Sequence, residues 1–160
     1  FTAHDGAAER QALIDFVDFV TTRLDENPDL RIYHYAPYEA TALRKLARRH
    51  QVKEGDVEFI IGNVLFDLLP VVRNSLRISE TSMSIKKLEP LYMDETRTGV
   101  SNGADSVAEY GHYRAAAAAG DGETARELLD GLLSYNEYDC YSTLKLRDWL
   151  LSIRPALVPA

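Results

Sequence analysis

Apolar residues recur at helical spacing in the first part of the chain and predict an amphipathic helix over residues 5–26. Offsets of three, four, seven and eleven residues from the first of them bring these positions onto one face: Leu13, Phe16, Val17, Val20 and Leu24. Asp5 suits the amino-terminal cap of this helix, and Asn27-Pro28 predicts its end.

Short apolar runs follow that helix and predict a mixture of strand and helix. The expected elements are a strand over Leu30–His34, a helix from Pro37 to about His50, and a short helix over residues 54–62. Val64–Phe66 is either a second strand or a part of the apolar stretch Leu68–Val72. Periodicity does not distinguish the two for so short a run.

The second half of the chain is predicted to be almost entirely helical. The expected elements are a helix over Ser84–Leu91 capped by Ser82 or Ser84, a mobile loop over Thr96–Asp105, and helices over residues 105–119 and 122–152. The last helix should break near Gly131–Tyr135, and Pro155 should end the fold. The whole order indicates an α/β fold with very little sheet.

Composition narrows the class of protein. A length of 160 residues with 46% hydrophobic residues suits one globular domain, and no apolar run of ~18 residues is long enough to cross a membrane. A formal net charge of −7 argues against a highly basic nucleic-acid binder but allows a local site. The single cysteine, Cys140, excludes an internal disulfide and a cysteine zinc cluster, so a reducing cytoplasm is the expected compartment.

Tyr135 and Asp139 form the sharpest candidate for chemistry. They are four residues apart and therefore share one face of a helix. A carboxylate there can hold a hard divalent cation, and a phenol one turn away can orient a water molecule. The pair taken alone favours the ordinary alternative, a solvated aspartate and a tyrosine packed on the core.

Two further acids, Glu39 and Asp67, each have one functional and one structural interpretation. Glu39 follows a predicted strand end, where open α/β folds bind ligands, but an acid in the first turn of a helix is also favoured by the helix dipole. Asp67 lies among apolar residues, so it either binds a metal or, as is more common, caps the following helix.

Basic residues gather near the end of the predicted helix that runs to His50. They are Arg44, Lys45, Arg48 and Arg49. Cations at a helix carboxyl end are ordinary dipole chemistry, and they are equally able to contact a phosphate backbone. The pair Lys86-Lys87 offers a weaker option of the same kind.

Three segments together resemble the motifs of a nuclease family. Residues 33–43 (Tyr-His-Tyr-Ala-Pro-Tyr-Glu-Ala-Thr-Ala-Leu) resemble the second exonuclease motif of the YprB-like branch of the ribonuclease-H-like superfamily. Residues 84–89 resemble the Ser-Leu-Lys segment between its motifs, and residues 135–144 resemble its third motif, of the Tyr-x-x-x-Asp type. The order and spacing also fit, over residues 1 to about 152.

The family is similar to DnaQ-type (DEDD) 3′–5′ exonucleases, and the resemblance implies a mostly helical, truncated ribonuclease-H-like fold with a small residual parallel sheet. It also implies two-metal hydrolysis of nucleic acid, DNA in particular, with Mg²⁺ or Mn²⁺. Glu39 then matches the second-motif acid, Asp139 the third-motif acid and Tyr135 the water-orienting residue, with Asp67 as a substitute ligand. The candidate phosphate contacts are Arg44, Arg48, Arg49 and Lys86. RecB-like relatives join this domain to a further nuclease region and a helicase region.

The first motif of the family, Asp-x-Glu on the first strand, has no counterpart here, because residues 1–30 are mostly one predicted helix. The chain also begins with Phe1 rather than methionine. We therefore expect residues 1–152 to be part of an exonuclease domain cut from a longer protein, with residues 153–160 as a tail.

Several expectations follow from the missing acids. With two of four acids, the isolated chain should bind metal weakly and be inactive or nearly so. The alternative is a non-catalytic nucleic-acid-binding or structural module of the parent protein. In either case the strand at residues 30–34 has lost its neighbours, and its exposed edge should lead to self-association.

Overall fold

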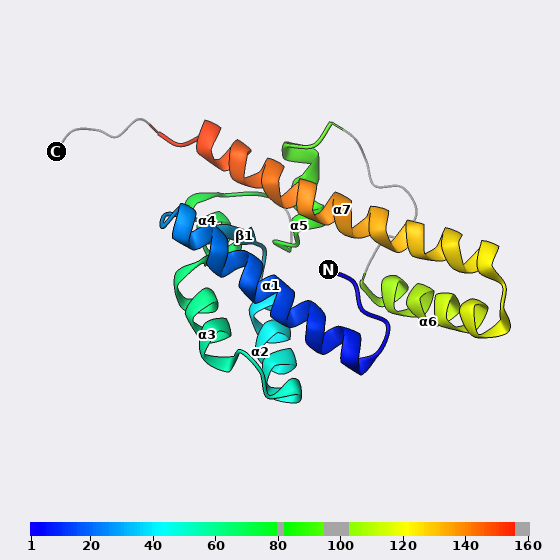
Figure 1. Cartoon of the computed structure of the whole chain (residues 1–160). Helices are drawn as coiled ribbons and strands as arrows, with labels where there is room; N and C mark the ends of the chain where they lie inside the picture. Colours follow the sequence, from blue (N-terminus) through cyan, green and yellow to red (C-terminus); the bar gives the residue numbers. More distant parts are fainter. Residues whose placement is uncertain (80–81, 95–102, 156–160) are drawn as a thin grey trace. The chain divides into compact units, whose positions relative to one another are not determined.

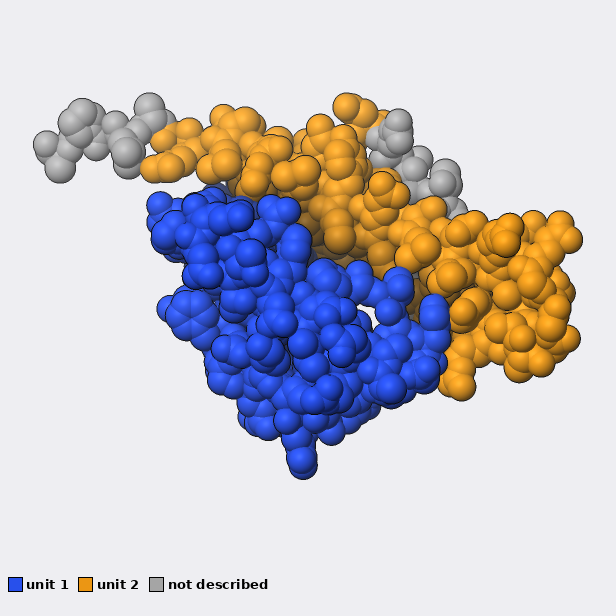
Figure 2. All heavy atoms as spheres, viewed as in Figure 1, with its two compact units in different colours: residues 1–79 blue, residues 80–160 orange. Residues whose placement is uncertain are grey.

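The computed structural model describes residues 1–79, 82–94 and 103–155. Backbone contacts divide the chain into two compact units, Phe1–Ser79 (unit 1) and Glu80–Ala160 (unit 2). Figure 2 colours the two units separately. No helix within the described ranges is long and apolar enough to span a membrane.

Unit 1 is built from helices and two short strands. Its elements are α1 (Gly6–Glu26), β1 (Ile32–His34), α2 (Tyr38–His50), α3 (Glu54–Asn63), β2 (Leu65–Asp67) and α4 (Leu68–Ser75). The buried residues of its core cluster come from α1, α2, α3 and the residue before β2: Leu13, Val17, Val20, Ala47, Val57, Ile60 and Val64. Each large apolar side chain buried here contributes about 1.5–3 kcal/mol to folding.

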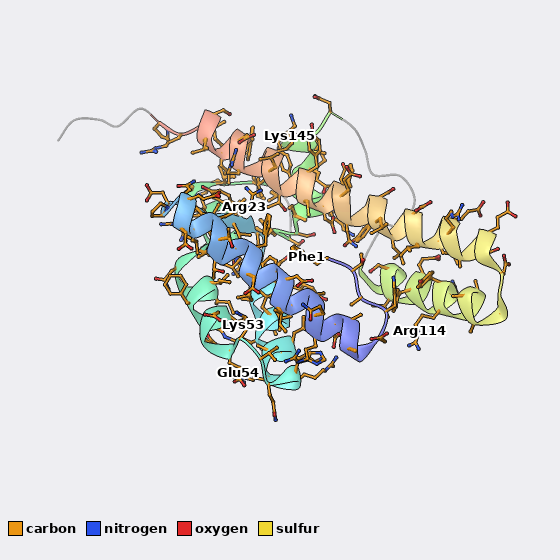
Figure 3. The ribbon with its side chains drawn as sticks, viewed as in Figure 1. Phe1, Arg23, Lys53, Glu54, Arg114 and Lys145 are labelled. Atoms are coloured by element: carbon orange, nitrogen blue, oxygen red, sulfur yellow. The ribbon has the colours of Figure 1, made fainter. Side chains whose placement is uncertain are left out.

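Helix α1 confirms the predicted amphipathic helix and both of its ends. The Asp5 side chain accepts a hydrogen bond from the backbone N–H of Ala8, and Asn27 is the carboxyl-terminal cap. At the other side of the core, the Lys53 amino group lies 2.8 Å from the Asp18 carboxylate. Lys53, labelled in Figure 3, directly precedes α3, so this ion pair ties the start of α3 to α1.

Two parallel strands make up the sheet of the described residues, with Ile32 opposite Leu65 and His34 opposite Asp67. Helices α2 and α3 connect them (Figure 1), because parallel strands need a long crossover. The structure therefore resolves the ambiguity at residues 64–66 in favour of a strand. The predicted strand at residues 30–34 is confirmed, two residues shorter. A mostly helical α/β fold with a small parallel sheet is confirmed as well.

Unit 2 consists of short helices and a long helical hairpin. Its elements are α5 (Ile85–Leu88), the 3₁₀ turn η1 (Glu89–Leu91), α6 (Gly103–Ala119) and α7 (Gly122–Ser152). Figure 1 shows α6 and the first half of α7 side by side, joined by a tight turn. Gly120 forms this turn with a φ of +77°, a conformation that suits glycine. The predicted helix at residues 105–119 is confirmed and begins two residues earlier.

The predicted break near Gly131–Tyr135 is wrong, because α7 is continuous from Gly122 to Ser152. A single glycine costs a helix only about 1 kcal/mol, which packing readily offsets. Leu132, the residue after the glycine, is buried and supplies such packing. Most of the predicted loop at residues 96–105 lies outside the described residues, and its last three residues begin α6. The end of the tail, residues 156–160, also lies outside them.

Candidate active site

In unit 1 the carboxyl ends of the two strands meet at one edge of the sheet. His34 and Asp67 are paired as the last residues of β1 and β2. Two residues after β1, Ala36 adopts a φ of +69°, in the left-handed region that most side chains avoid, and the chain then turns into α2. Glu39 lies in the first turn of α2. The structure therefore brings Glu39 and Asp67 to the same strand-end region.

Asp67 has a clear structural role in this region. One oxygen of its carboxylate, Oδ1, accepts hydrogen bonds from the backbone N–H of Leu69 and from that of Ala36, each at 2.9 Å. The first bond caps α4, and the second holds the left-handed turn after β1. The capping interpretation of Asp67 is therefore confirmed.

His34 connects the same turn to Glu39. Its Nδ1 lies 2.8 Å from the carbonyl oxygen of Ala36 and 3.3 Å from the Glu39 carboxylate. Because a carbonyl oxygen only accepts hydrogen bonds, Nδ1 carries the proton. The His34 side chain is 8% exposed, whereas that of Glu39 is 47% exposed. Glu39 thus presents its carboxylate to solvent beside a buried imidazole.

Tyr35 adds a phenol to the strand ends. Burial raises its pKa above the ordinary value, and the nearby Asp67 carboxylate acts in the same direction. The positive charge of Arg73 opposes both effects. The phenol of Tyr35 therefore stays protonated at neutral pH and serves as a neutral hydrogen-bonding group.

The basic residues of α2 are engaged in ion pairs within unit 1. Arg44 forms a two-pronged pair with Glu58 of α3, with N···O distances of 2.8 to 3.0 Å. Arg49 and His50 both contact the carboxylate of Glu9 on α1, His50 at 2.7 Å. Two of the three arginines predicted to contact phosphate are therefore already paired with carboxylates.

In unit 2 the predicted pair lies on α7. Tyr135 and Asp139 are one turn apart on this helix, and both are half-buried. The ammonium of Lys86, from α5, lies 5.6 Å from the centre of the Tyr135 ring, within cation–π range. The structure therefore brings together three predicted residues of this unit.

Sequence reasoning missed a buried polar cluster next to this pair. Ser142, one turn beyond Asp139, is fully buried, and its hydroxyl donates to the carboxylate of Glu89 at 2.9 Å. The Tyr92 hydroxyl lies 2.9 Å from the same serine oxygen. The sequence held one sign of this cluster: Glu89 directly follows the apolar Leu88 in a predicted helix with an apolar face.

The fit of these residues to a divalent metal is incomplete. Hard cations prefer several carboxylate oxygens together. Across residues 1–79, 82–94 and 103–155, no group of three or more His, Cys, Asp or Glu side chains is placed to hold a metal. Of the three predicted metal ligands, Asp67 is poorly suited to this role, since one oxygen of its carboxylate already accepts two backbone hydrogen bonds.

Comparison with known families identifies the class of the chain. A family model described as the RNase H superfamily matches residues 1–151. Because this match spans nearly the whole chain, the chain belongs to the RNase H superfamily. Searches against curated proteins and against solved structures give no match.

Membership of this superfamily supports nuclease-type hydrolysis of nucleic acid, and nucleases of this kind generally use divalent metals. The coarse part of the sequence prediction, an RNase H-like domain that acts on nucleic acid, is thereby supported. The narrower assignment to the YprB-like or RecB-like branch stays a prediction.

Proposed function

We propose that the chain is part of a metal-dependent 3′–5′ exonuclease domain that hydrolyses phosphodiester bonds in nucleic acid. One observation carries the proposal: Tyr135 and Asp139 lie one turn apart on α7, with the Lys86 ammonium over the Tyr135 ring, in a member of the RNase H superfamily. This arrangement combines an acid that can bind a metal, a phenol that can orient a water molecule and a cation that can contact a phosphate.

Each residue has a distinct role in this proposal. Glu39 in unit 1 and Asp139 in unit 2 are carboxylates that would each bind Mg²⁺ or Mn²⁺, and a bound ion would lower the pKa of water and offset phosphate charge. The phenol of Tyr135 orients the attacking water by a hydrogen bond. Lys86 places a positive charge where the anionic backbone of the substrate is held. His34 donates its Nδ1 proton toward the Ala36 carbonyl and keeps Glu39 beside the strand end.

A nuclease assay with labelled oligonucleotides tests the assignment. The full-length gene product and this 160-residue chain are incubated with 5′-labelled DNA and RNA strands in Mg²⁺ or Mn²⁺. We expect the full-length protein to shorten strands from the 3′ end and the isolated chain to be inactive or nearly so. In the full-length protein, Asp139→Asn should lower the rate at least ~100-fold, about 2.7 kcal/mol, and Tyr135→Phe about tenfold or more.

The matched control is Asp130→Asn, an exposed aspartate on the same helix, which should leave the rate unchanged. Robust metal-dependent activity that survives Asp139→Ala would contradict the catalytic assignment. Shortening from the 5′ end would contradict the proposed polarity, and equal rates on DNA and RNA would contradict a preference for DNA.

A non-catalytic nucleic-acid-binding module is the second candidate, favoured by the scattered positions of the acids among the described residues. In that role the free energy of binding depends on cations rather than on Asp139. Arg44 and Arg49 must first leave Glu58 and Glu9, so Arg48→Ala should weaken binding more than Arg44→Ala. Fluorescence anisotropy at several salt concentrations measures this, since each lost phosphate contact lowers the salt dependence. Absence of binding at low salt leaves a structural role.

The edge of β1 that faces away from β2 supports a proposal about assembly. An exposed strand edge offers N–H and C=O groups to another chain. We expect the isolated chain to self-associate through residues 30–34, or the parent protein to cover this edge with another strand. Sedimentation velocity over a range of concentrations measures the first; a monomer at every concentration would contradict it.

A further inference from the structure

A buried hydrogen-bonded chain joins η1 to α7 in unit 2. Ser142 has no exposed surface, and the Glu89 carboxylate beside it is only 7% exposed. Because the Ser142 hydroxyl donates its single proton to Glu89, it accepts from the hydroxyl of Tyr92. The direction of the bonds is therefore fixed, from Tyr92 through Ser142 to Glu89. We call these three residues the relay.

The relay lies on the same stripe of α7 as the candidate catalytic pair. Residues at steps of four and three along this helix form the stripe: Tyr135, Asp139, Ser142, Leu146 and Trp149. Three residues of α5, η1 and the cap after η1 contact this stripe in the order of the sequence. Lys86 lies over Tyr135, Glu89 bonds Ser142, and the ring of Tyr92 lies 6.1 Å from that of Trp149.

Burial of a carboxylate is costly, and apolar packing alone would hold α5 and η1 on α7 without that cost. Leu88, the residue before Glu89, is fully buried and already contributes apolar burial to this segment. A hydrogen bond, in contrast, fixes a direction and a distance, here between two elements separated by more than fifty residues of sequence. The relay therefore sets the register of α5 along α7.

We propose that Ser142 and Glu89 are positioning residues that hold the Lys86 ammonium beside Tyr135, where it receives a phosphate of the nucleic-acid substrate. The proposal rests on the proposed function for the role of Lys86, but the positioning itself does not depend on activity. Glu89 acts as a hydrogen-bond acceptor in this account, so glutamine at position 89 preserves the bond through its carbonyl oxygen.

NMR of the lysine side chains tests the positioning directly. The Nζ of Lys86 lies over the Tyr135 ring, so the ring current should displace the resonance of the neighbouring ε-methylene protons upfield. Tyr135→Leu identifies this displacement, and Lys45, an exposed lysine on α2 in unit 1, serves as the internal control. We expect the displacement to be lost in Ser142→Ala and in Glu89→Leu, and to be kept in Glu89→Gln.

Circular dichroism shows whether each variant is folded; if Glu89→Leu is not, Ser142→Ala carries the test, because it removes only a small polar group. An unchanged Lys86 displacement in folded Ser142→Ala would overturn the proposal and leave the relay a purely structural role. Loss of the displacement in Glu89→Gln would overturn the acceptor role of Glu89.

The assay that separates positioning from function is the affinity for a DNA strand, measured by anisotropy in the full-length protein. Ser142→Ala and Lys86→Met should each weaken binding, and the double variant should be no weaker than Lys86→Met alone. Additive losses would overturn the proposal that Ser142 acts through Lys86. If the NMR displacement behaves as expected but Lys86→Met binds DNA normally, the positioning stands and the proposed role of Lys86 fails.

Discussion

Asp67 in unit 1 and Asp139 in unit 2 are both candidate metal ligands, but their surroundings differ. Asp67 accepts two backbone hydrogen bonds, one that caps α4 and one that holds the left-handed turn at Ala36. Asp139 lies one turn before Ser142, whose hydroxyl donates to the carboxylate of Glu89 and so joins α7 to η1.

The residues that stabilise the fold overlap with the candidate site residues in unit 1 and differ from them in unit 2. At the strand ends of unit 1, one carboxylate both holds the fold and faces the candidate site, so substitutions there change stability and function together. Along α7, the relay joins the helix to η1, so substitutions at Ser142 and Glu89 should lower the free energy of unfolding.

The largest expected effect is that of Asp67→Ala. It leaves the N–H groups of Leu69 and Ala36 without their acceptor and should lower the free energy of unfolding by about 2 kcal/mol. Urea denaturation measures this, with the exposed Asp29→Ala as a matched control in the same unit. A loss below about 0.5 kcal/mol, the range of ordinary surface substitutions, would show that Asp67 does not hold the strand ends.

A pair of glycine variants tests two features of the α6–α7 hairpin: the continuity of α7 at Gly131 and the left-handed turn at Gly120. At Gly131, in the interior of α7, a β-carbon meets no neighbour within 4 Å, so Gly131→Ala should stabilise the chain by about 1 kcal/mol. At Gly120 the φ of +77° disfavours alanine, and Gly120→Ala should destabilise it by about 1 kcal/mol. Thermal unfolding of both variants gives the signs. Equal signs would contradict the continuous α7.

The smallest expected effect is the dependence of stability on pH through Glu9. Hydrogen bonds from His50 and then Arg49 lower the pKa of this carboxyl below its ordinary value of 4.5. A lowered pKa in the folded state means that the contribution is present above pH 4.5 and is lost as the pH falls through the folded-state pKa. Since the Glu9 side chain is about a third exposed, this contribution should be at most about 1 kcal/mol.

Glu9→Gln should therefore flatten the fall in stability below pH 4.5, as measured by urea denaturation from pH 3 to 7. The exposed Glu26→Gln on the same helix is the control. An identical pH profile for the wild type and Glu9→Gln would show that the α1–α2 ion pairs add nothing to stability.

The local elements of unit 1 could be predicted because apolar spacing, a cap and a proline each mark them. Residues 5–26 carry a complete helical stripe between Asp5 and Asn27-Pro28, and the structure reproduces both limits. Residues 64–66 could not be assigned, since a three-residue apolar run fits a strand or a helix equally. Its pairing with β1, which depends on residues more than thirty positions earlier, decides the matter.

In unit 2 the helices could be predicted from the sequence, but the predicted break near residues 131–135 was wrong. Gly131 received too much weight as a breaker, because the packing of Leu132 is a tertiary contact that the local sequence does not reveal. The helical pair Tyr135 and Asp139 could be predicted from spacing alone. The relay could not, since Ser142 and Glu89 are 53 residues apart and no local pattern pairs them.

The most direct test of the central claim, that Asp139 is a metal ligand of a nuclease site, is paramagnetic broadening by Mn²⁺ in NMR spectra of this chain. Mn²⁺ binds carboxylate oxygens, and weak binding suffices, as expected from a low ligand charge. We expect selective broadening of the amide signals around Asp139 on α7. This broadening should disappear in Asp139→Asn and persist in Asp130→Asn. Broadening that is unchanged in Asp139→Asn, or that never reaches this part of α7, would contradict the claim.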